Sequence, residues 1–446
     1  MALTKVSGEV ITRPLVLTGN ASVSGIMTVG TGSTTTTIDG SQDFPTIRPT
    51  LDLNFAATKT LDRRITFTRD SIGTYTDEFG IIQTVPNNVP RFDHDPVTGE
   101  SLGLLVEESR TNLHLHSENL SSWSVETGGS VGVNTTSTVA PDGNQTADSL
   151  FGTLNGSSAY TIISLSNATT YTFSVFLKYL TGNENIRIEI GDAPFARSST
   201  TFNTVTGVLV SNTGGTATVN EVKSYGNGWY RYSITRTTTS AGGGFMDINH
   251  VSTTSSSVAV WGAQVESGSF ATSYIPTTTA AVTRRADFAK ITGTNFTGFY
   301  NSSEGTLFAE SSFADLTTEN QATVQLWYSS TEHIGMGYRW GGSGSATYGF
   351  YIRNTADQLY RAPSGVTSNT FVKTSLAYKS NDGASSFNGE TAVFDDSINL
   401  PTASTEMTIG YGNQTSSYRM KQGHIKQLTY YNKRLTNSQL QSLTRQ

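Results

Sequence analysis

Residues 261–277 read WGAQVESGSFATSYIPT and contain a strand, then a turn, then an extended segment. Side chains alternate with period two across 258–263, which predicts a half-buried strand with Trp261 on one face. The polar residues Glu266–Ser269 then form a turn. Pro276 lacks a backbone N–H and favours extended geometry before it, so the strand does not continue. We therefore place a domain boundary at Pro276.

The composition fits an all-β protein. The chain has 446 residues, of which 35% are hydrophobic, 14% are charged and 43 are glycine. At roughly 150 residues per domain this length predicts about three units. Glycine supplies turns, and the abundant threonine suits a pleated, half-exposed surface. Disordered chains usually combine low hydrophobicity with high charge, so we expect most of this chain to fold.

Charge and targeting signals exclude several classes of protein. The net charge of -6 provides no basic field for DNA or RNA. The chain has no cysteine, so disulfides and thiolate metal sites are excluded. Its first residues contain no secretory signal, and no apolar run approaches the roughly 20 residues of a membrane span. We expect a protein that is made in a cytoplasm and does not insert into a membrane.

Residues 1–50 are too polar to bury a core of their own, because short apolar runs alternate with glycines. One interpretation is a flexible arm that becomes ordered on a partner. The other is an attachment and oligomerisation segment that adds strands to another copy of the chain or to a larger assembly. The apolar residues that would make the attachment are Val10, Ile11, Leu15, Val16 and Leu17.

The remaining chain divides into segments with different patterns. Strand periodicity is clear in Ile186–Ile190, where apolar and charged residues alternate. Repeated strand and turn signals predict tandem antiparallel β-sandwiches of the jelly-roll type. The predicted segments are a β-rich connector at 51–118, a sandwich at 119–276, a linker at 277–304 and a second sandwich at 305–446.

The end of the chain predicts a short helix. Thr436 and Gln439 have the spacing of a capping box. Leu440 and Leu443 are three residues apart and share one helical face. We expect this helix to cover the second sandwich.

Several motifs resemble those of fibre and virion-surface proteins of tailed bacteriophages, cyanophages in particular. Residues 119–276 also resemble a carbohydrate-binding-type β-sandwich, and 305–446 resemble a concanavalin-like or laminin-G-like lectin domain. The motifs are GNASVSGIMTVG at 19–30, PRFDHDPVTGE at 90–100, GLLVEESRTN at 103–112, GNGWYR at 226–231 and the stretch at 261–277.

The resemblance implies a virion structural protein, a tail-fibre-type adhesin that binds polysaccharide on the host surface without catalysis or a cofactor. It also implies a homotrimer whose N-terminal arm contacts other virion proteins. One alternative is a capsid-decorating, head-fibre or purely architectural virion protein. A second alternative is a polysaccharide depolymerase.

Sugar recognition requires exposed aromatic rings beside planar polar groups. Trp229 and Trp261 lie in strand patterns, so we expect both in the core. Trp340 lies in a glycine-rich loop, where it is a candidate ring for glycan binding, together with Tyr338 and Arg339. A second loop offers further candidates, with ordinary loop solvation as the alternative. These candidates are Tyr411, Asn413, Gln414 and Tyr418.

His114 and His116 would lie on one face of a strand. In a trimer, the threefold axis would bring six imidazoles together, enough for an octahedral metal ion. The alternative is two exposed histidines in the connector.

Four carboxylates are candidates for a hydrolytic pair, which requires two carboxyl groups about 5 or 6.5–9.5 Å apart. Glu107 and Glu108 are adjacent on a predicted strand and therefore point to opposite faces. Asp93 and Asp95 flank a turn. The sequence also has no Gly-x-Ser-x-Gly, phosphate-loop or His-Glu-x-x-His motif. The pattern thus favours binding over catalysis.

Overall fold

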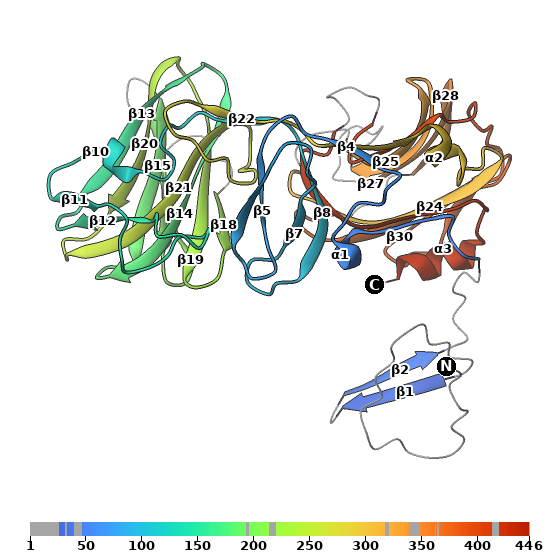
Figure 1. Cartoon of the computed structure of the whole chain (residues 1–446), viewed down its shortest axis with the longest axis horizontal. Helices are drawn as coiled ribbons and strands as arrows, with labels where there is room; N and C mark the ends of the chain where they lie inside the picture. The colour runs from blue at the N-terminus through green and yellow to red at the C-terminus, as the bar shows by residue number, and fades with distance from the viewer. Residues whose placement is uncertain are drawn as a thin grey trace. The chain divides into compact units, whose positions relative to one another are not determined.

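In the computed structural model two units are distinguished, residues 1–46 and 47–446. In the first unit β1 (Ile26–Thr31) and β2 (Thr34–Asp39) form an antiparallel pair (Figure 1). The predicted attachment residues Val10, Ile11, Leu15, Val16 and Leu17 lie outside the described residues. The described residues are 26–31, 34–39 and 47–445, apart from 193–195, 214–219, 317–320, 339–347, 362, 364 and 413–418.

The first sandwich consists of two antiparallel sheets, preceded by a 3-10 helix, η1 (Leu120–Ser122). One sheet has the order β10-β13-β20-β15-β16-β17, with strands at Ser124–Val125, Ser158–Leu165, Gly242–His250, Asn185–Asp192, Ala196–Asn203 and Leu209–Thr213. The other has the order β11-β12-β21-β14-β19-β18, with strands at Gly129–Gly132, Asp148–Gly152, Ser256–Ser267, Thr170–Thr181, Trp229–Thr237 and Asn220–Ser224.

The core of this sandwich lies between the two sheets. Alternate residues of each strand point inward, as Ile188, Ile248 and Phe173 do, and they form one buried cluster. A second buried cluster contains Trp229 and Trp261. The predicted burial of both tryptophans is confirmed.

The C-terminal sandwich also has two antiparallel sheets. In the described residues one sheet has the order β28-β27-β26-β25-β32-β23-β4, with strands at Ala356–Arg361, Tyr348–Asn354, Glu332–Tyr338, Gln321–Ser329, Glu406–Ile409, Phe288–Thr292 and Thr66–Thr68. The other has the order β31-β30-β29-β24-β33-β8-β7, with strands at Val393–Asp395, Gly383–Phe387, Val372–Lys379, Glu304–Phe313, Gln422–Tyr431, Ser101–Glu107 and Phe92–His94. β3 (Leu51–Asn54) also pairs with β33.

The all-β class with tandem antiparallel sandwiches is confirmed. The described helices are short: α1 (Phe55–Thr58), α2 (Gly293–Thr297) and α3 (Asn437–Thr444). None of them is long and apolar enough to cross a bilayer. Thr436 and Gln439 form the predicted capping box of α3, and α3 packs on β29 and β30.

The structure differs from the connector expected at 51–118. β3, β4, β7 and β8 are strands of the C-terminal sandwich: β3 and β8 pair with β33, β4 pairs with β23, and β7 pairs with β8. Without them these sheets would expose unpaired backbone groups at their edges. The segment expected to be a linker, 277–304, likewise contains β22 (Val282–Arg284), β23 and α2.

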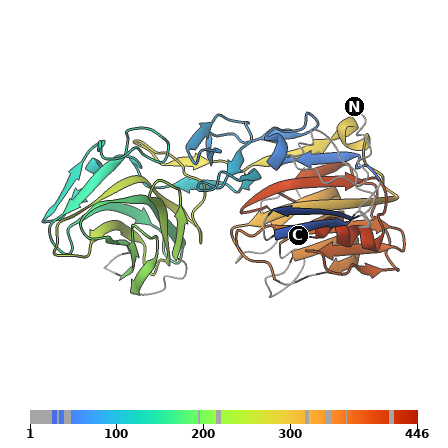
Figure 2. The same cartoon turned by 90° about the horizontal axis from the view of Figure 1, so that it is seen from below.

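A smaller group of strands lies between the sandwiches and forms the joint. It contains the pairs β5 (Gly73–Thr76) with β6 (Ile82–Val85), and β9 (Arg110–Asn112) with β22. Figure 2 shows the two sandwiches as separate groups of strands, with a blue segment near β5 to β9 and a yellow segment after β21 running between them. Both crossings of the chain from one sandwich to the other thus pass through the joint.

Candidate functional site

Two of the tyrosines proposed for glycan binding, Tyr338 and Tyr411, are buried. Tyr338 is the last residue of β26, is 0% exposed, and donates a hydrogen bond to the Leu316 carbonyl over 2.7 Å. The Tyr411 ring is buried edge-on against Phe288, with centroids 5.1 Å apart. Neither ring offers a free face to a sugar. The other proposed residues, Arg339, Trp340, Asn413, Gln414 and Tyr418, lie outside the described residues.

The two candidate metal ligands do not share a strand face, because β9 ends at Asn112. His114 is buried edge-on against Trp123, with centroids 5.0 Å apart. Burial, together with the charge of His116, lowers the pKa of His114 to about 4. His116 has a positive φ of 56°. Within the described parts of the chain, no group of three or more histidine, aspartate or glutamate side chains could hold a metal ion.

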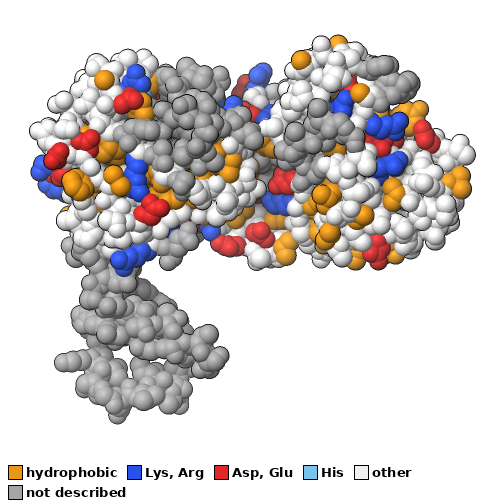
Figure 3. Space-filling view, turned by 180° about the vertical axis from the view of Figure 1, so that it is seen from behind, with side chains coloured by type: hydrophobic (Ala, Val, Ile, Leu, Met, Phe, Trp, Pro, Cys, Tyr) orange, Lys and Arg blue, Asp and Glu red, His pale blue; other side chains and the backbone are white. Residues whose placement is uncertain are grey.

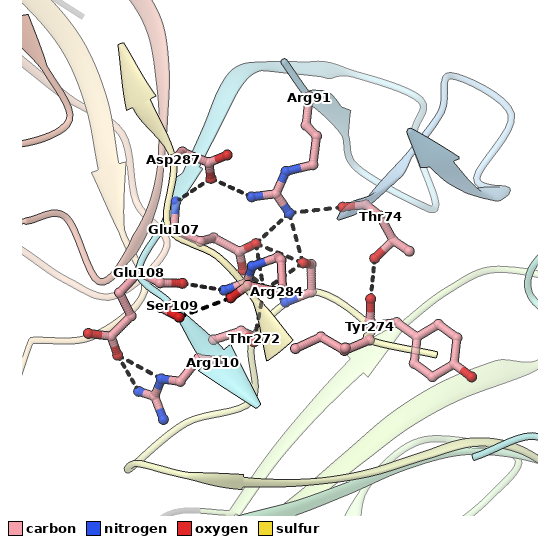
Figure 4. Close-up of polar contacts among 12 residues, drawn as sticks. Thr74, Arg91, Glu107, Glu108, Ser109, Arg110, Thr272, Tyr274, Arg284 and Asp287 are labelled. Carbon is pink, nitrogen blue, oxygen red and sulfur yellow. Dashed lines mark hydrogen bonds and ion pairs between the residues drawn. The ribbon is translucent and has the colours of Figure 1, made fainter. Parts of the chain in front are cut away.

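Glu107 lies in a buried charge network at the joint (Figure 4). Its side chain is 0% exposed and forms ion pairs with Arg91 over 2.6 Å and Arg284 over 3.0 Å. It also accepts hydrogen bonds from the backbone N–H and hydroxyl of Ser273. Burial alone would raise the pKa of Glu107, but Arg284 and Arg91 outweigh it and lower the pKa to about 2. Asp287 completes the network by pairing with Arg91 over 2.5 Å.

The other candidate carboxylates are also engaged. Glu108 pairs with Arg110 and Lys421. Asp93 accepts hydrogen bonds from the Thr76 N–H over 2.6 Å and from His424 Nε2 over 2.8 Å. Asp95 caps a turn by accepting two backbone N–H groups. These contacts give the four carboxylates structural roles.

A surface that the sequence interpretation missed lies on the first sandwich. One face of the sheet containing β13, β20 and β15 packs into the core, and the opposite face carries mostly polar side chains beside the exposed Ile162, which pairs with Phe245. Cross-strand pairing places Asp247 opposite both Tyr160 and Glu189, and Asn249 opposite both Ser158 and Arg187. We call the following residues the polar face: Ser158, Tyr160, Arg187, Glu189, Phe245, Asp247 and Asn249.

Charges on the polar face are concentrated at two carboxyl groups. The buried Glu189 pairs with Arg187 Nε over 2.9 Å and with Arg197 Nη1 over 3.2 Å. Burial raises the pKa of Asp247 to about 6, and the charge of Glu189 contributes in the same direction. Asn249 lies close enough to Asp247 to lower that pKa partly, yet no well-formed hydrogen bond engages Asp247 Oδ1 or Asn249 Nδ2. Both atoms are buried from solvent, so each carries the cost of an unpaired polar group.

An aromatic ring borders these polar groups. A Cβ atom built on Gly191 would lie only 2.2 Å from Phe245 Cε1, so the Phe245 ring lies directly over the Gly191 backbone. The Arg197 guanidinium carbon is 5.8 Å from the ring centroid. Phe245 is half-buried, so part of its ring remains accessible. An accessible ring beside carboxyl, amide and guanidinium groups is the combination that sugar recognition requires.

No protein family model and no curated protein match the sequence. Solved β-sandwich structures do show similarity. Domain 4 of the arabinanase AbnA from Geobacillus stearothermophilus, in complex with arabinotriose, is 14% identical, with 36% of this chain and 73% of that chain covered and a TM-score of 0.28. The CBM40 of Ruminococcus gnavus IT-sialidase, bound to α2,3 sialyllactose, is 12% identical, with 34% and 88% covered and a TM-score of 0.28. Mouse laminin α1 LG4-5 is 8% identical, with 71% and 94% covered and a TM-score of 0.24. Similarity at this level carries no argument about the function of this chain.

Proposed function

We propose that this protein is a non-catalytic, glycan-binding adhesin of a bacteriophage virion, of the tail-fibre type, and that its polar face binds host-surface polysaccharide. The observation that carries the proposal is the polar face itself, where the half-buried Phe245 ring lies near the Arg197 guanidinium and on the same strand face as the partly exposed Asp247. The phage-type motifs support the virion assignment. The N-terminal arm would join copies of the chain into a trimer and attach them to the virion.

Binding at such a face would be weak for each copy, because a partly exposed sheet buries little of a sugar. Several copies on one virion would bind one host surface together. Linked sites raise the overall affinity by roughly 10²–10⁴-fold without any new contact. A trimer with weak sites therefore suffices for firm attachment.

The polar face has one feature of a hydrolase, which keeps the depolymerase as a second candidate. Asp247, with a pKa of about 6, lies opposite Glu189 and could hold a proton for an acid step. However, both oxygens of Glu189 are paired with arginines and its side chain is buried, so it has no free oxygen to attack a sugar. If the protein released reducing ends from host polysaccharide and Asp247→Asn abolished this release, the result would support the depolymerase instead.

Replacing Phe245 by alanine should weaken binding to host polysaccharide about tenfold, because loss of an aromatic contact costs about 1 kcal/mol or slightly more. Glycan arrays would identify the ligand, and titration calorimetry on the full chain would measure its affinity. Phe151→Ala is the matched control, since Phe151 is exposed on β12 of the other sheet. Equal affinities of wild type and Phe245→Ala would place the binding site elsewhere.

Binding should also depend on pH through Asp247. Its carboxyl group is ionised above a pKa of about 6 and protonated below it. If sugar hydroxyls donate to the carboxylate, affinity is full at pH 7.5 and falls up to about tenfold for each pH unit below 6. Calorimetry between pH 5 and pH 8 measures this slope. Asp247→Asn should bind weakly and show no such slope, and the same slope in this variant would assign the titration to another group.

A further inference from the structure

A cavity of about 290 Å³ lies at the joint, separate from the polar face. Its walls come from three parts of the chain: Tyr75 and Asp93 from the strands of the joint and the adjoining sheet, Lys223 and Arg231 from the first sandwich, and Asn369 and His424 from the C-terminal sandwich. We call it the junction cavity. Small-molecule sites typically measure roughly 300–1,000 Å³, so this volume admits one small molecule and excludes an oligomer.

One cation presents a free donor to the junction cavity. Lys223 Nζ makes no ion pair or hydrogen bond with a described residue, and its closest ring partner is Tyr225 at 5.5 Å. Burial would lower the pKa of Lys223, but the nearby tyrosine and carboxylates raise it above its ordinary value, so the group is charged. The buried Arg231 donates from its two terminal nitrogens to the Thr272 carbonyl and the Ser174 hydroxyl. Its Nε has no partner but is buried from solvent, so Arg231 offers no accessible donor to a ligand.

The remaining walls suit a neutral molecule. Asp93 accepts hydrogen bonds from Thr76 and His424, one on each carboxylate oxygen. Its negative charge therefore offsets part of the positive charge around the cavity, but its two oxygens are not both free to accept from a ligand. Asp95 and Glu221 also line the cavity, and the three carboxylates would repel an anion. Tyr75 is half-buried, and burial raises the pKa of its hydroxyl, which therefore remains a donor.

We infer that the junction cavity binds a single neutral sugar residue, whose hydroxyl oxygens accept hydrogen bonds from Lys223 Nζ and from the Tyr75 hydroxyl. This site is independent of the polar face, so either can fail without the other. Because both sandwiches contribute walls, a bound sugar contacts both and stabilises the joint. A ligand that binds only the folded chain raises the free energy of unfolding.

Calorimetry and thermal unfolding of the full chain with glucose, galactose, mannose, rhamnose and glucuronate test the inference. At least one neutral sugar should bind saturably and raise the Tm. Its affinity should fall at least tenfold in Lys223→Ala and several-fold in Tyr75→Phe, which keeps the ring and removes the hydroxyl. Lys178→Ala is the matched control, because Lys178 is a partly buried lysine of the same sandwich that bonds to Thr138.

The outcomes separate this site from the polar face. Phe245→Ala should leave the binding of the single sugar unchanged. No Tm shift with any neutral sugar, or wild-type affinity in both Lys223→Ala and Tyr75→Phe, would overturn the inference. Preferential binding of glucuronate would overturn the assignment to neutral sugars.

Discussion

Glu107→Ala should lower the free energy of unfolding by about 3–5 kcal/mol, because removing one partner leaves buried charges uncompensated. Arg284 loses its ion-pair partner, Arg91 loses one of its two carboxylate partners, and the Ser273 N–H loses its acceptor. Denaturation of the full chain in urea, followed by tryptophan fluorescence, measures the change. Since the network ties both sandwiches to the joint, the transitions of both should move to lower urea concentration.

A control for Glu107→Ala is Glu100→Ala, which removes an exposed ion pair with Lys426. Exposed pairs contribute at most about 1 kcal/mol, so this variant should unfold almost as the wild type does. Equal small effects of the two substitutions would mean that the arginines find other partners or water when Glu107 is absent. The joint would then not depend on this network.

The charge network accounts for several residues of the motifs at 90–112 and after 261–277. Arg91 and Glu107 belong to the motifs at 90–100 and 103–112, and Arg284 and Asp287 follow the stretch at 261–277. These residues are far apart in the chain but pair in the structure. Glu107 was a candidate for catalysis on its residue type alone. Its partners show that it is part of the joint.

Local patterns were sufficient to predict much of the fold. Period-two alternation predicted the strand containing Trp261, and the same alternation predicted its burial. The spacing of Thr436 and Gln439 predicted the capping box of α3. Each of these features depends on residues within a few positions of one another, which is the range that periodicity and capping rules describe.

Other features depend on pairings that local patterns do not contain. The pairing of Leu51 with Tyr430 joins residues that are distant in sequence, so the strands at 51–107 read as a separate connector. Tyr338 was assigned to a loop, but β26 extends to this residue and turns its ring into the core. The polar face did leave a signal, since Asp247 and Asn249 alternate with Met246 and Ile248. Only the register of three strands shows that these polar residues meet Arg187 and Glu189.

Trp261→Ala should be as destabilising as loss of the buried carboxylate. The side chain is 1% exposed, packs against Phe176 and Tyr274 at centroid distances of 5.3 and 4.5 Å, and donates a hydrogen bond from Nε1 to the Thr146 hydroxyl. Truncating a buried tryptophan to alanine costs about 3–5 kcal/mol, because it removes apolar burial and leaves a cavity. Thermal and urea unfolding of the full chain measure the loss.

The location of Trp261 makes this loss specific to one part of the molecule. Tyr274, its ring partner, bonds to Ser117 and Glu118 at the edge of the first sandwich, so the first sandwich should unfold earlier while the C-terminal sandwich is little affected. Hydrogen exchange resolves the two sandwiches. Phe79→Ala is the control, because Phe79 is 78% exposed and its loss should be nearly neutral. Equal acceleration of exchange in both sandwiches would show that they unfold as one cooperative unit through the joint.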